Sequence, residues 1–156
     1  MLGLDGLEGI FCEREWVVEE GHAAAHLRSR GLEVLATPYM LLYGEVTARE
    51  CLDRRLPEDI VSVGVEALVR HLAPVPVGGR VLVNARIVGV AGRSVSVLVR
   101  VTRDDGVIAG EIYHVRRVVS LEDLKTVSNR LRRGGLEGRN LFTLNSNRVS
   151  FITIFR

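Results

Sequence analysis

Residues 35–55, LATPYMLLYGEVTARECLDRR, carry the signal that decides the fold. Thr37 followed by Pro38 is typical of a helix start, because threonine caps the first N–H groups and proline at the first helical position leaves no N–H unsatisfied. Apolar residues then recur at helical spacing until Pro57, which cannot continue a helix. The stretch therefore predicts one long helix from 37 to about 55.

On both sides of this helix the apolar residues alternate with polar ones, which is the period of a β-strand. The expected strands lie within residues 13–19, 59–74, 79–90, 93–104 and 106–119. In the second strand, every other residue from Val61 to Val69 is expected on one apolar face, which His71 shares by parity. Residues 20–31, EGHAAAHLRSRG, predict a short helical turn that ends at Gly31.

The links between the later strands are short and contain Gly or Asp, as in VAGRS at 90–94 and RDDGV at 103–107. Such links favour antiparallel hairpins. One long helix followed by a meander of long strands predicts an α+β fold, with the helix lying on one face of an antiparallel sheet.

The composition is that of an ordinary globular domain, with 47% hydrophobic and 26% charged residues in a chain of 156. No apolar run reaches the roughly 18 residues of a membrane span, and the first residues lack the basic and apolar segments of a signal peptide. We therefore expect a cytoplasmic protein with no membrane contact. Free thiols are then the first expectation for Cys12 and Cys51, with a disulfide or reactive thiols as alternatives.

The charge is unevenly distributed along the chain. Residues 1–124 contain 14 Arg and 18 acidic residues, whereas residues 125–156 contain seven Lys or Arg and the single acid Glu137. We expect a domain over 1–126 and a divergent basic C-terminal extension over 127–156. A basic extension can contact nucleic acid, but no aromatic and basic interleaving organises this one, so nucleic-acid binding is not expected.

Four residues of the helix and second strand are candidates for chemistry. Glu45 lies at the margin of the apolar helix face, either as a surface ion pair with Arg49 worth about 0.3 kcal/mol or as a base or nucleophile at a helix–sheet cleft. His71 is either a core histidine or an acid–base partner across the same seam. Thr37 lies where helix N–H groups favour a developing oxyanion. Gly64 inside a strand indicates a bulge or the close approach of a ligand.

Motifs of several other enzyme classes are missing from the sequence. There is no GxSxG, P-loop or GxGxxG, so serine-hydrolase, nucleotide-phosphate and dinucleotide-binding functions have no motif behind them. His22 and His26 have a metal-ligand spacing, but no HExxH occurs and no third ligand is indicated, so no metal is expected. His114, beside Arg116 and Arg117 in the last strand, is expected to be structural.

The spacing of the candidates resembles that of the hotdog-fold thioesterases, and most closely the fluoroacetyl-CoA thioesterase family. Members carry an alanine–threonine pair at the start of the helix, a glutamate eight residues later, a strand glycine, and a histidine seven residues past it before a proline-containing turn. The matching positions are Ala36, Thr37, Glu45, Gly64, His71 and the turn APVPVGG at 73–79. The strand GEIYHVRRVV at 110–119 is similar to the family's last strand, and the resemblance covers about residues 13–124.

The resemblance implies a hotdog fold and hydrolysis of a short-chain acyl-CoA thioester to the free acid and coenzyme A. Thr37 would position the acyl carbonyl, Glu45 would attack it or activate water, and His71 would act as general acid/base. The residues expected to line the acyl site are Gly64, Ala36 and Leu35. Coenzyme A is part of the substrate, so no cofactor is implied. The cleft is expected at a homodimer interface, and the dimers could assemble further.

One departure from the family concerns the segment RSRGLEVL at 28–35, which contains no phenylalanine. The specialised fluoroacetyl enzyme has aromatic residues there as a lid, so a more general acyl-CoA substrate is expected for this chain. The alternative function is a non-catalytic hotdog domain that binds acyl-CoA as a sensor or partner. A hydratase of the same fold would need an aspartate–histidine pair near the helix, and no such pair is present.

Overall fold

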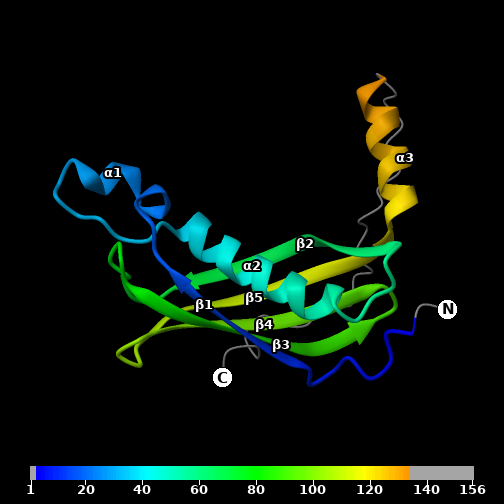
Figure 1. Ribbon diagram of the computed structural model, residues 1–156, viewed down its shortest axis with the longest axis horizontal. Helices are drawn as coiled ribbons and strands as arrows, with labels where there is room; N and C mark the ends of the chain where they lie inside the picture. Colours follow the sequence, from blue (N-terminus) through cyan, green and yellow to red (C-terminus); the bar gives the residue numbers. More distant parts are fainter. Residues whose placement is uncertain (1–2, 134–156) are drawn as a thin grey trace.

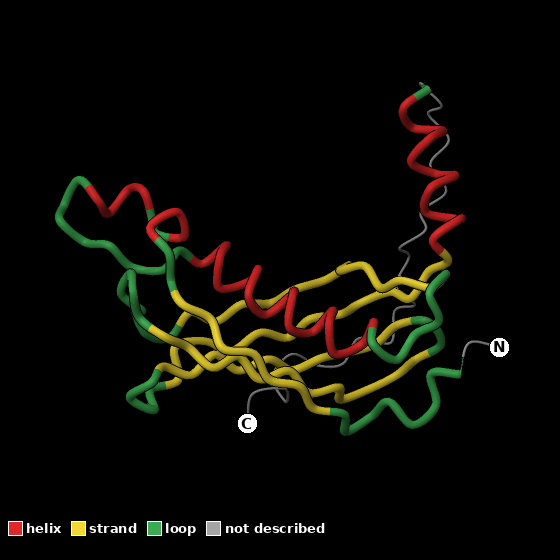
Figure 2. The backbone as a smooth tube through the Cα atoms, viewed as in Figure 1, coloured by secondary structure: helices red, strands yellow, loops and turns green. Residues whose placement is uncertain are grey.

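The computed structural model describes residues 3–133, and its central feature is a five-stranded sheet with one long helix across it (Figure 1). The strands are β1 (Phe11–Val17), β2 (Ile60–His71), β3 (Arg80–Ala91), β4 (Ser94–Arg103) and β5 (Ile108–Ser120). They lie in the order β1-β3-β4-β5-β2, and every neighbouring pair is antiparallel. Helix α2 (Thr37–Asp53) lies on one face of this sheet (Figure 2). The predicted α+β class is confirmed.

The core lies between α2 and the sheet, and two glycines let the helix and strands approach closely. A Cβ on Gly44 would lie 2.5 Å from Cδ1 of Ile112, and a Cβ on Gly110 would overlap Sδ of Met40. Around these contacts the odd-numbered valines of β3 and β4 are buried against the helix. Complete burial of such a side chain contributes about 1.5–3 kcal/mol, so this seam holds α2 firmly on the sheet.

The N-cap of α2 is Ala36, so the prediction of Thr37 as N-cap is wrong by one residue. The Ala36 carbonyl accepts hydrogen bonds from the N–H groups of Tyr39 and Met40, at 3.0 and 3.1 Å, while its own backbone is extended. Thr37 is the first helical residue and Pro38 follows it within the first turn. The Thr37 hydroxyl is therefore released from capping and can serve another group.

Strand β2 contains a bulge, because its register with β5 shifts between Gly64 and Glu66. Before the bulge Ser62 and Gly64 face α2, and after it His71 faces α2. The expectation that Val61 to Val69 share one face is therefore wrong. The extra residue reverses the alternation of the strand from that point onward.

Cys12 of β1 and Cys51 of α2 form a disulfide, so the expectation of free thiols is wrong. The bond ties the outer strand β1 to the last turns of the long helix. The two cysteines are 39 residues apart in sequence, and only the packing of α2 onto the sheet brings them together.

Short helical elements flank the sheet. The predicted helical turn consists of η1 (Glu20–His22) and α1 (Ala25–Arg28), and the left-handed backbone of Gly31, with φ +74°, follows it. After β5, helix α3 (Leu121–Arg132) extends away from the sheet (Figure 1). The expected domain boundary at 126 falls inside α3, and the expected extension beyond 133 lies outside the described residues. Over residues 3–133, no helix has the length and apolar character of a membrane span.

Candidate active site

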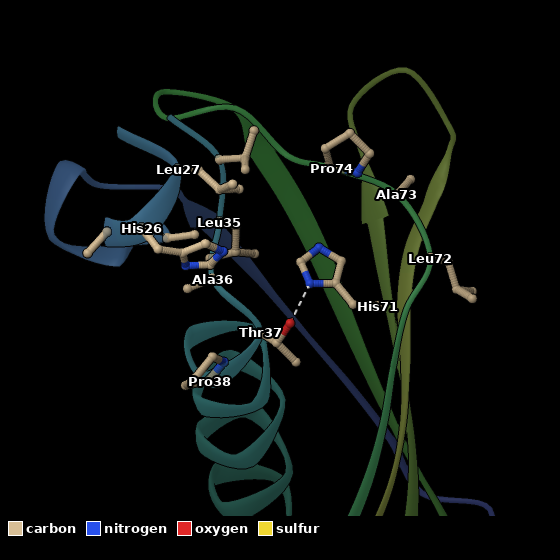
Figure 3. Close-up of a pocket in the computed structure, with 13 residues that line it drawn as sticks. His26, Leu27, Leu35, Ala36, Thr37, Pro38, His71, Leu72, Ala73 and Pro74 are labelled. Carbon is tan, nitrogen blue, oxygen red and sulfur yellow. Dashed lines mark hydrogen bonds between the residues drawn. The ribbon is translucent and has the colours of Figure 1, made fainter. Parts of the chain in front are cut away.

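A cavity of about 620 Å³ opens at the N-terminal end of α2. Its walls come from α1, from the segment that enters α2, and from the end of β2 with the residues after it (Figure 3). The lining residues from α1 and the entering segment are mostly small or aliphatic, namely Ala24, Ala25, His26, Leu27, Val34, Leu35 and Ala36. Three of the expected site residues therefore share this cavity with His71, because Leu35, Ala36 and Thr37 also line it.

Thr37 and His71 form a hydrogen-bonded pair on one wall of the cavity. The Thr37 hydroxyl oxygen lies 2.9 Å from Nδ1 of His71, as the dashed line in Figure 3 shows. The pair forms because the helix begins at Thr37 and because the bulge in β2 turns His71 toward the helix. A hydroxyl and an imidazole at a helix N-terminus, where N–H groups point outward, can bind a carbonyl oxygen and transfer a proton.

A second imidazole, which the sequence did not single out for this cavity, lies on the opposite wall. His26 of α1 points toward the cavity from the side facing His71 (Figure 3). Among the described residues, no group of three or more His, Cys, Asp or Glu is arranged to hold a metal ion.

Glu45 and Gly64 form a separate cluster farther along α2. A Cβ built on Gly64 would lie 2.9 Å from Oε1 of Glu45, so the carboxylate lies directly against the glycine of β2. The Glu45 side chain is 40% exposed, and its ion partner within the described residues is Arg116 of β5, at 3.5 Å, rather than Arg49. The surface pair with Arg49 that local spacing suggested is therefore wrong.

Arg116 is buried under this cluster and is firmly held. Its Nε donates to the Ser62 hydroxyl at 2.9 Å, and Nη2 donates to the Ser62 carbonyl at 2.8 Å. The Ser62 hydroxyl in turn donates to Asp53 of α2 at 2.7 Å. Burial lowers the pKa of the Arg116 guanidinium, which the Glu45 and Asp53 carboxylates counteract. A buried guanidinium with fixed hydrogen bonds gives the Glu45 carboxylate a defined orientation.

His114 completes the cluster from the neighbouring position on the same face of β5. Its Nε2 lies 3.0 Å from the point that a Cβ of Gly64 would occupy, and only 2% of the residue is exposed. Burial in the first place, and Arg116 in the second, lower the pKa of His114 to about 4, against the opposing effect of Glu45. The imidazole is therefore neutral near pH 7. The sequence did not indicate this position beside Gly64 and Glu45, and the structural role expected for His114 stays a prediction.

The predicted residues thus fall into two groups along α2. Thr37 and Glu45 are separated by eight residues, which is about 12 Å at the helical rise of 1.5 Å per residue. Within one chain, the Thr37–His71 pair and the Glu45 carboxylate therefore do not converge on one point.

The sequence places His114 and Arg116 on one face of a strand, but Tyr113, Val115 and Val119 make the other face equally apolar, so the alternation alone does not show which face packs against the helix. His114 and Arg116 alternate with Ile112 and Val118, all four at even positions of one strand. In the structure Ile112 and Val118 are fully buried, and the histidine and arginine between them lie on the same face, which packs against α2. Buried ionisable residues that alternate with apolar ones are a signal of a functional site.

The sequence matches a known family over much of the domain. The model of the fluoroacetyl-CoA-specific thioesterase family matches residues 18–122. A sequence comparison with curated proteins gives no match.

Solved structures resemble the whole described fold. A thioesterase-superfamily protein from Thermus thermophilus has a TM-score of 0.76 at 23% identity, covering 84% of this chain and 97% of its own. A hot-dog-like protein from Thermanaerovibrio acidaminovorans has a TM-score of 0.74 at 28% identity, covering 88% and 100%. The fluoroacetyl-CoA thioesterase itself has a TM-score of 0.71 at 26% identity, covering 79% and 95%. The predicted hotdog fold is confirmed.

Proposed function

The chain belongs to the fluoroacetyl-CoA-specific thioesterase family, and on that premise we propose that it hydrolyses a short-chain acyl-CoA thioester to the free acid and coenzyme A. The observation that carries the proposal is the hydrogen bond between Thr37 and His71 on the wall of a mostly apolar cavity, at the N-terminus of α2. The reaction consumes water and needs no cofactor, because coenzyme A enters as part of the substrate.

Each candidate side chain has a role in this reaction. Thr37 and the first N–H groups of α2 bind the thioester carbonyl oxygen and stabilise the negative charge that develops on it. Glu45 attacks the carbonyl carbon or takes a proton from the water that does so. When the C–S bond breaks, the thiolate of coenzyme A leaves and receives a proton from His71.

The roughly 12 Å between Thr37 and Glu45 along α2 supports a site shared by two subunits. Strand β2 is the outermost strand of the described sheet on that side, so a second copy can pair with it about a twofold axis. We propose that this pairing brings Glu45 of the partner subunit to the Thr37–His71 pair, giving a homodimer with two equivalent sites.

Mixing two inactive variants tests the shared site. In a refolded equimolar mixture of Glu45→Gln and His71→Ala chains, half of the dimers are mixed, and each mixed dimer has one intact site. The expected activity is therefore about a quarter of that of the unmodified protein. If each site used only its own chain, the mixture would stay as inactive as the separate variants, which serve as controls.

The cavity wall supports a substrate range wider than fluoroacetyl-CoA. Variants of the fluoroacetyl enzyme form complexes with fluoroacetate and CoA or with acetyl-CoA. In the present chain the cavity wall carries Leu27, Val34 and Leu35. Aliphatic side chains leave room for acyl groups of different shapes and offer no selective contact to fluorine.

A thioester panel tests the function directly. Release of free coenzyme A should be measured with acetyl, propionyl, butyryl, isobutyryl, fluoroacetyl and octanoyl-CoA, and we expect the highest kcat/KM among the unfluorinated short chains. Saturable binding of these thioesters without release of coenzyme A would favour the alternative, an acyl-CoA sensor. Release from fluoroacetyl-CoA alone would contradict the wider substrate range.

A further inference from the structure

The mechanism above gives no role to His114, a buried ionisable residue of β5. The residue is 2% exposed, and within the described part of the chain its Nδ1 is buried without a hydrogen-bond partner. Burying a polar atom without a partner destabilises the folded protein. A buried histidine without a partner in the middle of a strand is explained if its imidazole takes part in the reaction at the neighbouring Glu45.

The reactive edge of this imidazole faces Glu45 across Gly64. The nearest atoms to a Cβ built on Gly64 are Oε1 of Glu45 at 2.9 Å and Nε2 of His114 at 3.0 Å. The carboxylate oxygen and the imidazole nitrogen are therefore at most about 6 Å apart, a separation that one bridging water can span. Glycine at position 64 has no side chain between them.

The charges around Glu45 and His114 hold the Glu45 carboxylate in place and keep the His114 imidazole neutral. Arg116, held by Ser62, contacts the same Oε1 of Glu45 and lies on the same face of β5 as His114. Burial and this guanidinium keep His114 uncharged near pH 7. A neutral imidazole can hold a water molecule by one hydrogen bond, and it leaves the Glu45 carboxylate charged and able to take a proton from that water.

Resting on the proposed thioesterase function, we propose that His114 is a positioning residue that holds the attacking water against Glu45 through Nε2. Glu45 takes one proton of that water, and the water oxygen forms a bond to the thioester carbon while the carbonyl electron pair moves to oxygen. Re-formation of the carbonyl breaks the C–S bond, and the leaving thiolate of coenzyme A takes a proton from His71. The proton on Glu45 then passes through solvent to His71, so that both residues return to their starting states. The inference selects water activation over direct attack by the Glu45 carboxylate.

Three substitutions at this position separate the role of Nε2 from a structural role. Glutamine places a polar group where Nε2 lies, asparagine places one nearer to Nδ1, and leucine has a similar volume without polar atoms. We expect His114→Gln to keep kcat within about tenfold of the unmodified protein. We expect His114→Asn and His114→Leu to lower kcat by about 10²-fold with little change in KM.

Thermal unfolding of the same variants gives the matched control. His114→Leu removes the unpartnered Nδ1, so its Tm should equal or exceed that of the unmodified protein although its kcat is lower. In a Glu45→Gln background, His114→Leu should lower kcat no further, because the two residues act on one water.

Each outcome decides a separate question. If the unmodified protein releases no coenzyme A from any thioester, the proposed function fails. If the unmodified protein does release coenzyme A, three results would overturn only the role of His114. The His114→Leu variant could keep the full kcat, its Tm could fall together with its kcat, or its effect on kcat could add fully to that of Glu45→Gln.

Discussion

Glu45→Gln lowers kcat for release of coenzyme A by about 10³-fold. The amide has nearly the shape of the carboxylate, but it neither accepts a proton from water nor attacks a thioester carbon. Its oxygen still accepts a hydrogen bond from Arg116, so we expect the free energy of unfolding to change by about 1 kcal/mol or less. Steady-state kinetics with the best thioester of the panel, together with thermal unfolding, measure both effects.

The matched control for this variant is Glu50→Gln on the same helix. Glu50 pairs with Arg14 of β1 at 2.5 Å, on the opposite flank of α2 from the cavity-facing strand β2. We expect its kcat to stay within about twofold of the unmodified protein, because a partly exposed ion pair contributes about 1 kcal/mol or less to stability and nothing to the reaction. Equal kcat values for the two variants would remove Glu45 from the mechanism.

Loss of the Cys12–Cys51 disulfide is expected to cause the largest change in stability. The bond closes a loop of 39 residues, and the chain-entropy relation gives about 4 kcal/mol of stabilisation for a loop of that length. The Cys12→Ala/Cys51→Ala variant should therefore unfold about 10 °C lower. Alanine is the suitable replacement because Cys51 is almost fully buried and a serine hydroxyl there would need a partner.

Reduction provides an independent test of the same bond. With a strong thiol reductant present, the Tm of the unmodified protein should fall to that of the double-alanine variant, while the Tm of the variant stays constant. A Tm that reductant leaves unchanged would contradict the assignment. In a reducing cytoplasm, the compartment expected from the sequence, the thiols would stay reduced and the enzyme would lack this stabilisation.

Much of the fold follows from local sequence patterns, because each pattern repeats over many residues. The long helix was predicted within two residues at its C-terminal end, and the long strands appear where the alternation of apolar residues predicts them. Turn residues in short links then require antiparallel neighbours. These features depend on contacts close in sequence, which a single chain reveals.

The features that were not predicted depend on single residues or on distant contacts. The bulge that Gly64 indicated is confirmed, but its effect on β2 was not predicted: one added residue reverses which side chains face α2. The disulfide and the Glu45–Arg116 pair join positions 39 and 71 residues apart, which no local pattern links. The separation of Thr37 from Glu45 is different, because the helical rise alone gives it. The family resemblance, which groups both residues in one site, obscured that simple geometry.

The bulge in β2 also bears on how relatives of this chain should be aligned. Gly64 and His71 are seven positions apart, and in a regular strand an odd spacing places two residues on opposite faces. The bulge between Gly64 and Glu66 lets both face α2 despite that spacing. In any relative, the gain or loss of one residue between these positions therefore moves one of them to the far side of the sheet, whereas a change of two residues does not. An alignment that places a single-residue gap in this strand therefore predicts that one of the two residues no longer faces the helix, even where every residue type matches.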